Sequence, residues 1–411
     1  MPPWIRHFRD WAIPDLFGGL RRPATPTSQG LVISYEKAGV VVRQEPVPWN
    51  ADHLRVEALL RVPVGILRRK TDFSLHCDGQ IVGPELLQVE NGNVCRLGFS
   101  LEPPRRTSVV ELRWREQSIG QAVAPILREE DFFDHLHLTQ PTVAVQLAGQ
   151  MTACEAYLSS QGKVLLAGGV LSSPTSLAPL AGQELRIELT DKATGKCQTA
   201  SMRLTAQQLS QRETLWQSLM PRARRSPGVW FVQWMIGERS LARRELRVMG
   251  RRSVAALITC MGTQYLRRSS GGVVELLRHL SAAAPSDWLG VAFLLRAKEA
   301  GLALTAPFQV FLRRKNGQRE AVPLFHEEVL VTDGPTPLLP PLLSGGELAD
   351  VAGFELVCNG RVLGQVSTSP TPEAHFSAEG GFQDAPDEFP WSPASDAELM
   401  DRLKKLAEQV G

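Results

Sequence analysis

The residues best suited to chemistry lie in one short stretch, where two histidines follow a run of acidic side chains. Imidazole nitrogens and carboxylate oxygens are common ligands of zinc. His135 and His137 are two positions apart, so in a strand both project from the same face, with Asp131 nearby. A metal site needs three or four ligands, and an acidic linker leading into a strand explains this stretch equally well. We therefore predict no metal and no cofactor, and keep Asp131, His135 and His137 as the candidates for a metal site.

Short motifs of common active sites are missing from the chain. It has no Gly-x-Ser-x-Gly, no phosphate-binding Gly-x4-Gly-Lys-Ser/Thr loop, no dinucleotide fingerprint and no HExxH. The segment Leu-Ser-Gly-Gly-Glu at 343–347 resembles the signature of ABC-type ATPases. Without a phosphate loop to complete such a site, we interpret it as a turn. The prediction is a protein that is not an enzyme, although a site assembled between distant segments would leave no linear motif.

Basic residues recur in pairs and triplets, and if they lined one face they could neutralise nucleic-acid phosphates. Most fall in or beside expected turns, where solvated charges are common. They are Arg68-Arg69-Lys70, Arg105-Arg106, Arg222 with Arg224-Arg225, Arg243-Arg244, Arg251-Arg252, Arg267-Arg268 and Arg313-Arg314-Lys315.

Composition places the chain among folded proteins of several domains. Its 411 residues are 43% hydrophobic and 21% charged, with a net charge of +2. These values exclude a disordered or collagen-like chain. No apolar run approaches the roughly 18–20 residues of a membrane-spanning helix, and charges interrupt the first 22 residues, which therefore do not read as a secretory signal. The six cysteines form no Cys-x-x-Cys pair. We expect reduced, buried thiols and a cytoplasmic protein.

An internal repeat is the strongest pattern in the chain. Three segments begin alike, at 31–35, 143–147 and 254–258, and further matches follow at 73–77, 185–189 and 308–312. The best match joins 110–114, 230–234 and 354–358, where apolar residues alternate with others. Alternation with period two indicates strands with one face in a core. The repeat of about 110–120 residues predicts a triplicated β-sandwich.

Turn residues support this interpretation, because Asp78-Gly79, Asn316-Gly317 and Asn359-Gly360 are typical of tight hairpins. The pattern resembles immunoglobulin-like or fibronectin-III-like domains. The immunoglobulin framework of two bridged cysteines around a tryptophan is missing, since Cys358 aligns with Trp114 and Trp234. The predicted fold is mainly β, with three tandem sandwiches, short helical insertions and a C-terminal helix. The predicted ranges are an N-terminal segment 1–28, sandwiches 29–135, 136–250 and 251–371, and a tail 372–411.

Two stretches inside the sandwiches do not alternate clearly. Residues 205–220 have Leu209, Leu215, Trp216 and Leu219 at near-helical spacing and are expected to include a helix. Residues 273–280 fit either a short helix or an apolar strand.

Both ends of the chain carry candidate partner-binding residues. Trp4, Phe8 and Trp11 give the N-terminal segment one apolar side, which suits a membrane surface, a partner groove or the first sandwich itself. The last 40 residues hold nine acidic and three basic residues, a net charge of −6 that leaves +8 on the rest. Their aromatic residues are typical of segments that order on binding. The predicted partner-binding set of the tail is Phe382, Phe389, Trp391, Leu399, Leu403 and Leu406.

A C-terminal helix is expected to begin at Ser395, because Ser395 and Glu398 form a capping box. Leu399, Leu403 and Leu406 then lie on one stripe, which such a short helix must bury, either on the third sandwich or on another protein.

The sequence therefore predicts a non-enzymatic scaffold or adaptor of a multiprotein assembly that binds other proteins through its two ends. The alternative is a nucleic-acid-binding or glycan-binding sandwich that uses the arginine and lysine pairs.

Overall fold

A computed structural model describes residues 25–43, 45–63, 70–89, 93–220, 225–250, 252–277, 286–368, 401, 403 and 405–408. The chain is mainly β, as predicted, and its contacts divide it into two compact units. Unit 1 comprises residues 1–137 with two later segments, 172–182 and 204–214, and unit 2 comprises the rest. The boundaries predicted for single sandwiches stay predictions. None of the described helices is long and apolar enough to cross a membrane.

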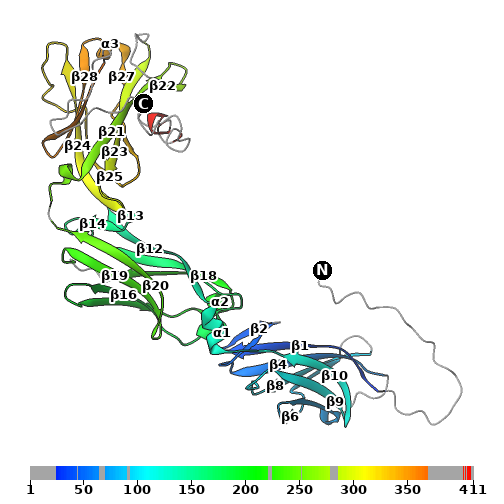
Figure 1. Ribbon diagram of the computed structural model, residues 1–411. Coiled ribbons are helices and arrows are strands. Elements are labelled where there is room, and N and C mark those ends of the chain that lie inside the picture. The colour runs from blue at the N-terminus through cyan, green and yellow to red at the C-terminus, as the bar shows by residue number, and fades with distance from the viewer. Residues whose placement is uncertain are drawn as a thin grey trace, which may run out of the picture. The chain divides into compact units, whose positions relative to one another are not determined.

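Unit 1 holds a sandwich of two antiparallel sheets (Figure 1). One sheet has the order β2-β1-β4-β8-β7 and the other β10-β9-β5-β6, while β3 and β11 form a short parallel pair. Apart from the extra edge strand β2, this is the A-B-E-D and G-F-C-C′ arrangement of immunoglobulin-like domains. The strands are β1 (Thr27–Lys37), β2 (Val40–Arg43), β3 (Val47–Pro48), β4 (His53–Arg61), β5 (Phe73–Cys77), β6 (Gln80–Val82), β7 (Leu86–Val89), β8 (Val94–Leu101), β9 (Ser108–Trp114), β10 (Gln117–Ala124) and β11 (Ile126–Leu127).

The described part of unit 1 also contains four short helical elements and a polar cluster. The elements are the 3₁₀ turn Lys70–Asp72, α1 (Glu129–Asp134), the 3₁₀ turn Ala178–Leu180 and α2 (Ala206–Leu209). Glu45 accepts the backbone N–H of Ser176 at 2.7 Å and a two-pronged contact from Arg212 at 2.9 and 3.1 Å. The Tyr35 and Ser176 hydroxyls lie 2.8 Å apart. Burial raises the pKa of Tyr35 to about 12, so this phenol is neutral near pH 7.

The second sandwich lies in unit 2, except for the first residue of β12, the last of β15 and the first two of β18, which are assigned to unit 1. Its sheets have the orders β13-β12-β15-β18 and β17-β16-β19-β20-β14. The strands are β12 (His137–Leu147), β13 (Gln150–Ala153), β14 (Ala156–Leu158), β15 (Leu165–Ser172), β16 (Leu185–Asp191), β17 (Cys197–Met202), β18 (Glu213–Met220), β19 (Gly228–Ile236) and β20 (Arg239–Met249).

The third sandwich completes unit 2. Its sheets have the orders β22-β21-β23-β26, with β27 also on β23, and β25-β24-β28-β29. The elements are β21 (Ile258–Arg268), β22 (Val274–Leu277), β23 (Trp288–Ala297), β24 (Leu302–Arg314), β25 (Phe325–Val331), β26 (Thr336–Leu338), β27 (Leu343–Ser344), α3 (Gly345–Leu348), β28 (Val351–Cys358) and β29 (Arg361–Ser367).

One sheet has the same strand order in all three sandwiches, β10-β9-β5-β6, β20-β19-β16-β17 and β29-β28-β24-β25, as expected for the predicted tandem sandwiches. The matched segments at 73–77, 185–189 and 308–312 all lie in the C-type strands β5, β16 and β24. Those at 110–114, 230–234 and 354–358 lie in the neighbouring F-type strands β9, β19 and β28. The predicted start of the third copy was wrong, because 254–256 is a 3₁₀ turn and the equivalent strand β21 begins at Ile258.

Parallel pairing through β14 makes the second and third sandwiches share a sheet. Ala156 pairs with Arg247 of β20 on one side and with Leu302 of β24 on the other. The Gln161 amide adds two hydrogen bonds to the Thr305 backbone, at 2.6 and 2.9 Å. Residues 154–161 therefore hold the two sandwiches together within unit 2.

Two of the hairpin turns are confirmed. Both residues of Asp78-Gly79 and of Asn359-Gly360 have positive φ, as a two-residue turn between twisted strands requires. At Asn316-Gly317 the chain also turns back at once, since the Arg314 N–H donates to the Gln318 carbonyl at 2.9 Å and Arg313 bridges Arg319, but the longer pairing strand β25 starts only at Phe325.

The helix expected within 205–220 is confined to α2, and residues 213–220 form the strand β18. Trp216 and Met220 are buried, whereas Leu215 and Leu219 are more than half exposed. The apolar residues of this stretch therefore lie on opposite faces of a strand. Of the two alternatives for 273–280, the strand is observed as β22.

Candidate partner-binding surfaces

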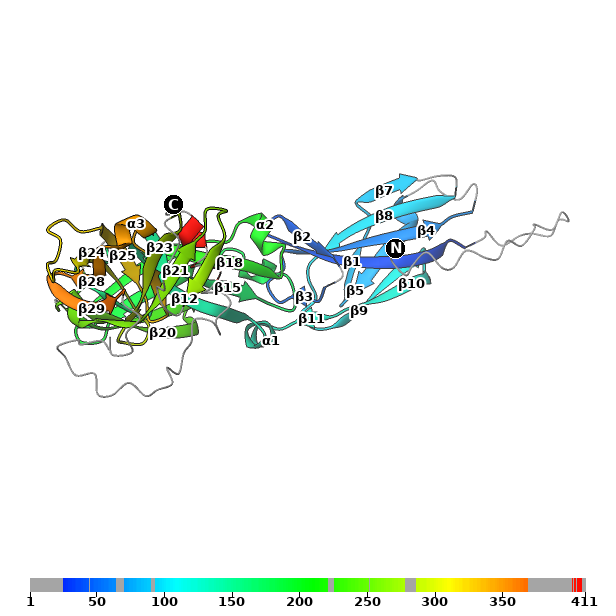
Figure 2. The ribbon, with the colours of Figure 1, turned by 90° about the horizontal axis from the view of Figure 1, so that it is seen from above.

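Of the predicted partner-binding residues, the structure describes only Leu403 and Leu406, which lie on the C-terminal helix. The others, which lie outside the described residues, are Trp4, Phe8, Trp11, Phe382, Phe389, Trp391 and Leu399. Residues 401, 403 and 405–408 are helical, and the helix lies beside β21 and β23 in both views (Figures 1 and 2). The described part of the helix thus docks on the chain's own third sandwich, which is the intramolecular alternative that the sequence left open.

The contact between helix and sheet is apolar. Leu403 and Ala407 are fully buried, and Leu406 is partly buried. They meet an outer sheet face, named here the helix-binding face, that is formed by residues of β21, β23 and the segment after β26. Its buried members are Leu266, Ala292, Leu294, Leu339 and Leu342, with Met261 and Val274 partly buried at its margin.

Strand β23 explains why this face is apolar. Val291, Phe293 and Leu295 point into the sandwich core, while Ala292 and Leu294 point outward to the helix. A strand covered on both faces has no polar alternation, and residues 288–297 are an almost unbroken apolar run. That run is the sequence signal that identifies a covered outer face.

The metal candidates do not have the geometry that the sequence suggested. His135 follows helix α1, and its Nδ1 lies 2.7 Å from the Asp131 carbonyl oxygen. Strand β12 begins only at His137, so the two histidines do not share a strand face. Within the described ranges, no three His, Cys, Asp or Glu side chains are grouped so that they could hold a metal.

Comparisons with known proteins found similarity in shape only. No known family and no curated protein sequence matches the chain. InvD of Yersinia pseudotuberculosis is 7% identical over 82% of this chain and 96% of that one, with a TM-score of 0.22. The Escherichia coli adhesin FdeC is 12% identical over 84% and 96%, with a TM-score of 0.23. The I9–I11 tandem of titin is 8% identical over 78% and 94%, also with a TM-score of 0.23. The sandwich assignment therefore rests on the strand order of this chain.

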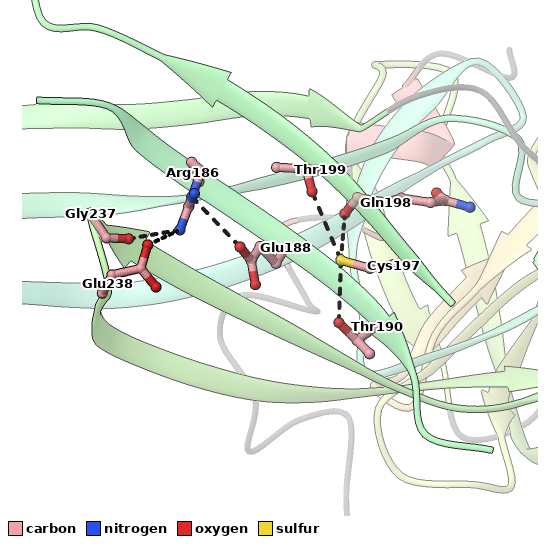
Figure 3. Close-up of polar contacts among 8 residues, drawn as sticks. All are labelled: Arg186, Glu188, Thr190, Cys197, Gln198, Thr199, Gly237 and Glu238. Carbon is pink, nitrogen blue, oxygen red and sulfur yellow. Dashed lines mark hydrogen bonds and ion pairs between the residues drawn. The ribbon is translucent and has the colours of Figure 1, made fainter. Parts of the chain in front are cut away.

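A second surface is the outer face of the sheet formed by β17, β16, β19 and β20 (Figure 3). Arg186 donates to the Gly237 carbonyl at 2.8 Å and lies 3.6 Å from Glu188 and 3.4 Å from Glu238. The Arg243 guanidinium covers the Phe231 ring at 3.6 Å, and the Lys192 ammonium lies 5.6 Å from it. The charge of Arg186 on this face is therefore partly compensated locally.

Cys197 belongs to the same face and is the exposed thiol of the chain. The Thr190 hydroxyl lies 3.5 Å from its Sγ, and the thiol points toward the Gln198 carbonyl at 3.8 Å (Figure 3). None of the six cysteines, all of which lie in the described ranges, is in a disulfide.

The thiols should differ in reactivity according to burial. Burial raises the pKa of Cys154 to about 12 and those of Cys260 and Cys358 to about 11, and the thiolate is the reactive form. A short treatment of the folded protein with iodoacetamide at pH 8, followed by peptide mass spectrometry, should label Cys197 first. The denatured chain, without reductant, should take up six adducts. Labelling of Cys154 at the same rate as Cys197 would contradict this prediction.

Many residues of the basic pairs are already engaged in ion pairs. Arg252 lies 3.2 Å from Glu299, Arg267 lies 3.4 Å from Glu275, and Arg314 pairs with Glu320. In β24 the outward Phe311 is covered by the Arg319 guanidinium, which also contacts Glu355 at 2.7 Å. These arginines hold strands and turns together, which makes them less available to phosphates.

The segment at 343–347 has a local structural role. The Ser344 hydroxyl accepts the backbone N–H of Glu347 at 3.3 Å, and the Glu347 carboxylate accepts the Ser344 backbone N–H at 2.7 Å. This capping box starts helix α3 and keeps the pKa of Glu347 below its usual value. Instead of a simple turn, the segment forms the end of β27 and the first turn of α3.

Proposed function

We propose that this chain is a non-enzymatic scaffold or adaptor that gathers other proteins in the cytoplasm. The three sandwiches would space the partners, and the N-terminal segment and acidic tail would bind them. The observation that carries the proposal is the helix-binding face, a surface of the third sandwich that holds an amphipathic helix through buried Leu403 and Ala407. Helix-on-groove docking is a common mode of recognition between proteins.

Two further observations support protein partners over nucleic acid. The arginines 252, 267 and 314 have carboxylate partners, so they contribute little net positive charge to the surface. The sequence places its largest charge asymmetry in the acidic tail, whose net charge of −6 would be repelled by phosphates. A basic or amphipathic protein surface is the better match for such a tail.

Quantitative affinity purification from the native host tests the proposal. The full-length chain should retain proteins that are reduced at least tenfold on a 1–371 truncation or on a Trp4→Ser, Phe8→Ser, Trp11→Ser variant. A matched control replaces Ile81 and Val322 by serine, because both side chains are mostly exposed and lie away from the ends. The control should retain the full set. Identical retention by all four proteins, or retention of nucleic acid alone, would contradict the proposal.

A further inference from the structure

Among the described residues, the contacts between the helix-binding face and its helix are apolar. Leu403 and Ala407 are buried among Leu266, Ala292 and Leu294. Lys405 of the helix finds its carboxylate partner within the helix, at Asp401, 2.6 Å away. The contact is therefore made by shape and apolar area, and the same helix from any source would satisfy it.

The helix is short, and its stability depends on this contact. Isolated helices of fewer than about 12–15 residues are marginal in water, because the first turn is costly to form. Docking and helix formation are therefore coupled, and undocking exposes both the stripe of the helix and the helix-binding face. The apolar stripe of the helix and the helix-binding face are complementary, because each covers the other in the docked state.

The connecting chain is long enough for the helix to reach beyond its own sandwich. Strand β29 ends at Ser367, and Leu403 follows 36 positions later. A chain of that length spans at most about 130 Å. Because the helix is tethered to the sandwich that carries the face, the intramolecular contact prevails in dilute solution.

We propose that the helix-binding face also receives the C-terminal helix of a second copy of this chain, by exchange of identical helices. The exchanged contacts are the same as the intramolecular ones, so exchange requires no new interface. It becomes favourable where copies are held close together, or where one copy has lost its own helix contact. This inference does not depend on the identity of any partner and goes beyond the scaffold proposal.

Two full-length variants with complementary defects test the exchange. Leu403→Asp leaves the helix-binding face intact and removes the helix contact, because a buried leucine becomes a charge. Ala292→Glu leaves the helix intact and places a charge on the face. Each variant alone should be a monomer at about 100 µM by light scattering. Their equimolar mixture should show a 1:1 heterodimer, since one supplies the helix and the other the face.

Two outcomes would overturn the inference. One is a mixture that stays monomeric, and the other is dimers formed equally by each variant alone, which would place the contact elsewhere. A second measurement needs only the Leu403→Asp chain. A fluorescent peptide of residues 395–411 should bind this chain at least about tenfold more tightly than the same peptide carrying Leu403→Asp. The wild-type chain should bind the peptide more weakly, because its own helix competes. Equal affinity of both peptides would also overturn the inference.

Discussion

Replacing Trp234 by alanine should lower the free energy of unfolding of the second sandwich by about 3–5 kcal/mol, the usual cost of emptying a buried aromatic site. Trp234 is fully buried in β19 and lies opposite Ile187 of β16. The equivalent positions are Trp114 in the first sandwich and Cys358 in the third, and both are buried. The three copies therefore use the same core position with side chains of different volume.

Hydrogen exchange of the β16 and β19 amides measures the loss of unfolding free energy in the second sandwich alone. A local measurement is needed because the sandwiches of a multidomain chain need not unfold together. The slowest amides should exchange between about a hundred and a few thousand times faster, at about 1.4 kcal/mol per factor of ten. Trp234→Phe is the matched control. The indole N–H of Trp234 is buried and has no hydrogen-bond partner among the described residues, so the phenyl ring loses volume but no bond. A larger effect of phenylalanine than of alanine would contradict the argument.

Adding a single methyl group at Gly353 should destabilise the third sandwich by roughly 1–3 kcal/mol, the range of overpacked sites. Gly353 lies in β28 opposite Ser367 of β29. A Cβ built there would be 2.3 Å from the Val366 carbonyl oxygen and 3.3 Å from the Ser367 Cα. Both obstacles are backbone atoms, so Gly353→Ala must push the two strands apart.

Chemical denaturation, followed by hydrogen exchange of the β28 and β29 amides, would check this effect. Gly346→Ala is the control, because a Cβ at Gly346 meets nothing within 4 Å. Alanine there, inside the short helix α3, should leave stability unchanged or raise it slightly. Equal effects of the two substitutions would show that loss of glycine freedom, and not the close backbone approach, determines the result.

The sandwich fold could be predicted from the sequence because its signals are local. Alternation places Leu75 and Leu112 inside the first sandwich, and Asn359-Gly360 sets a hairpin through its positive φ angles. Alternation fails where a strand is buried on both faces, as β23 is, or where both faces carry apolar residues, as in β18. In those strands the order of apolar and polar residues depends on what packs against the outer face of the sandwich. A period of two along the sequence does not reveal that.

The candidate site was predicted only in part. The stripe containing Leu403 and Leu406 was found from helical spacing, but its docking surface requires residues 60 to 140 positions earlier in the chain. The same is true of Glu45, whose partners Ser176 and Arg212 lie far along the sequence. Long-range contacts of this kind leave no spacing rule in a single sequence. The expected shared strand face of His135 and His137 was wrong for a local reason, since helix α1 ends at Asp134 and strand β12 begins only at His137.

The parallel strand β14 has a mechanical consequence. Its backbone bonds join the second and third sandwiches, with Glu155 donating to the Gly301 carbonyl at 2.9 Å and Ser159 donating to the Met249 carbonyl at 2.9 Å. Under a pulling force, these two sandwiches would not separate from each other as domains joined only by a linker would. The force would act on several backbone hydrogen bonds of β14 in parallel, which must break nearly together. The second and third sandwiches would therefore stay joined until these bonds rupture.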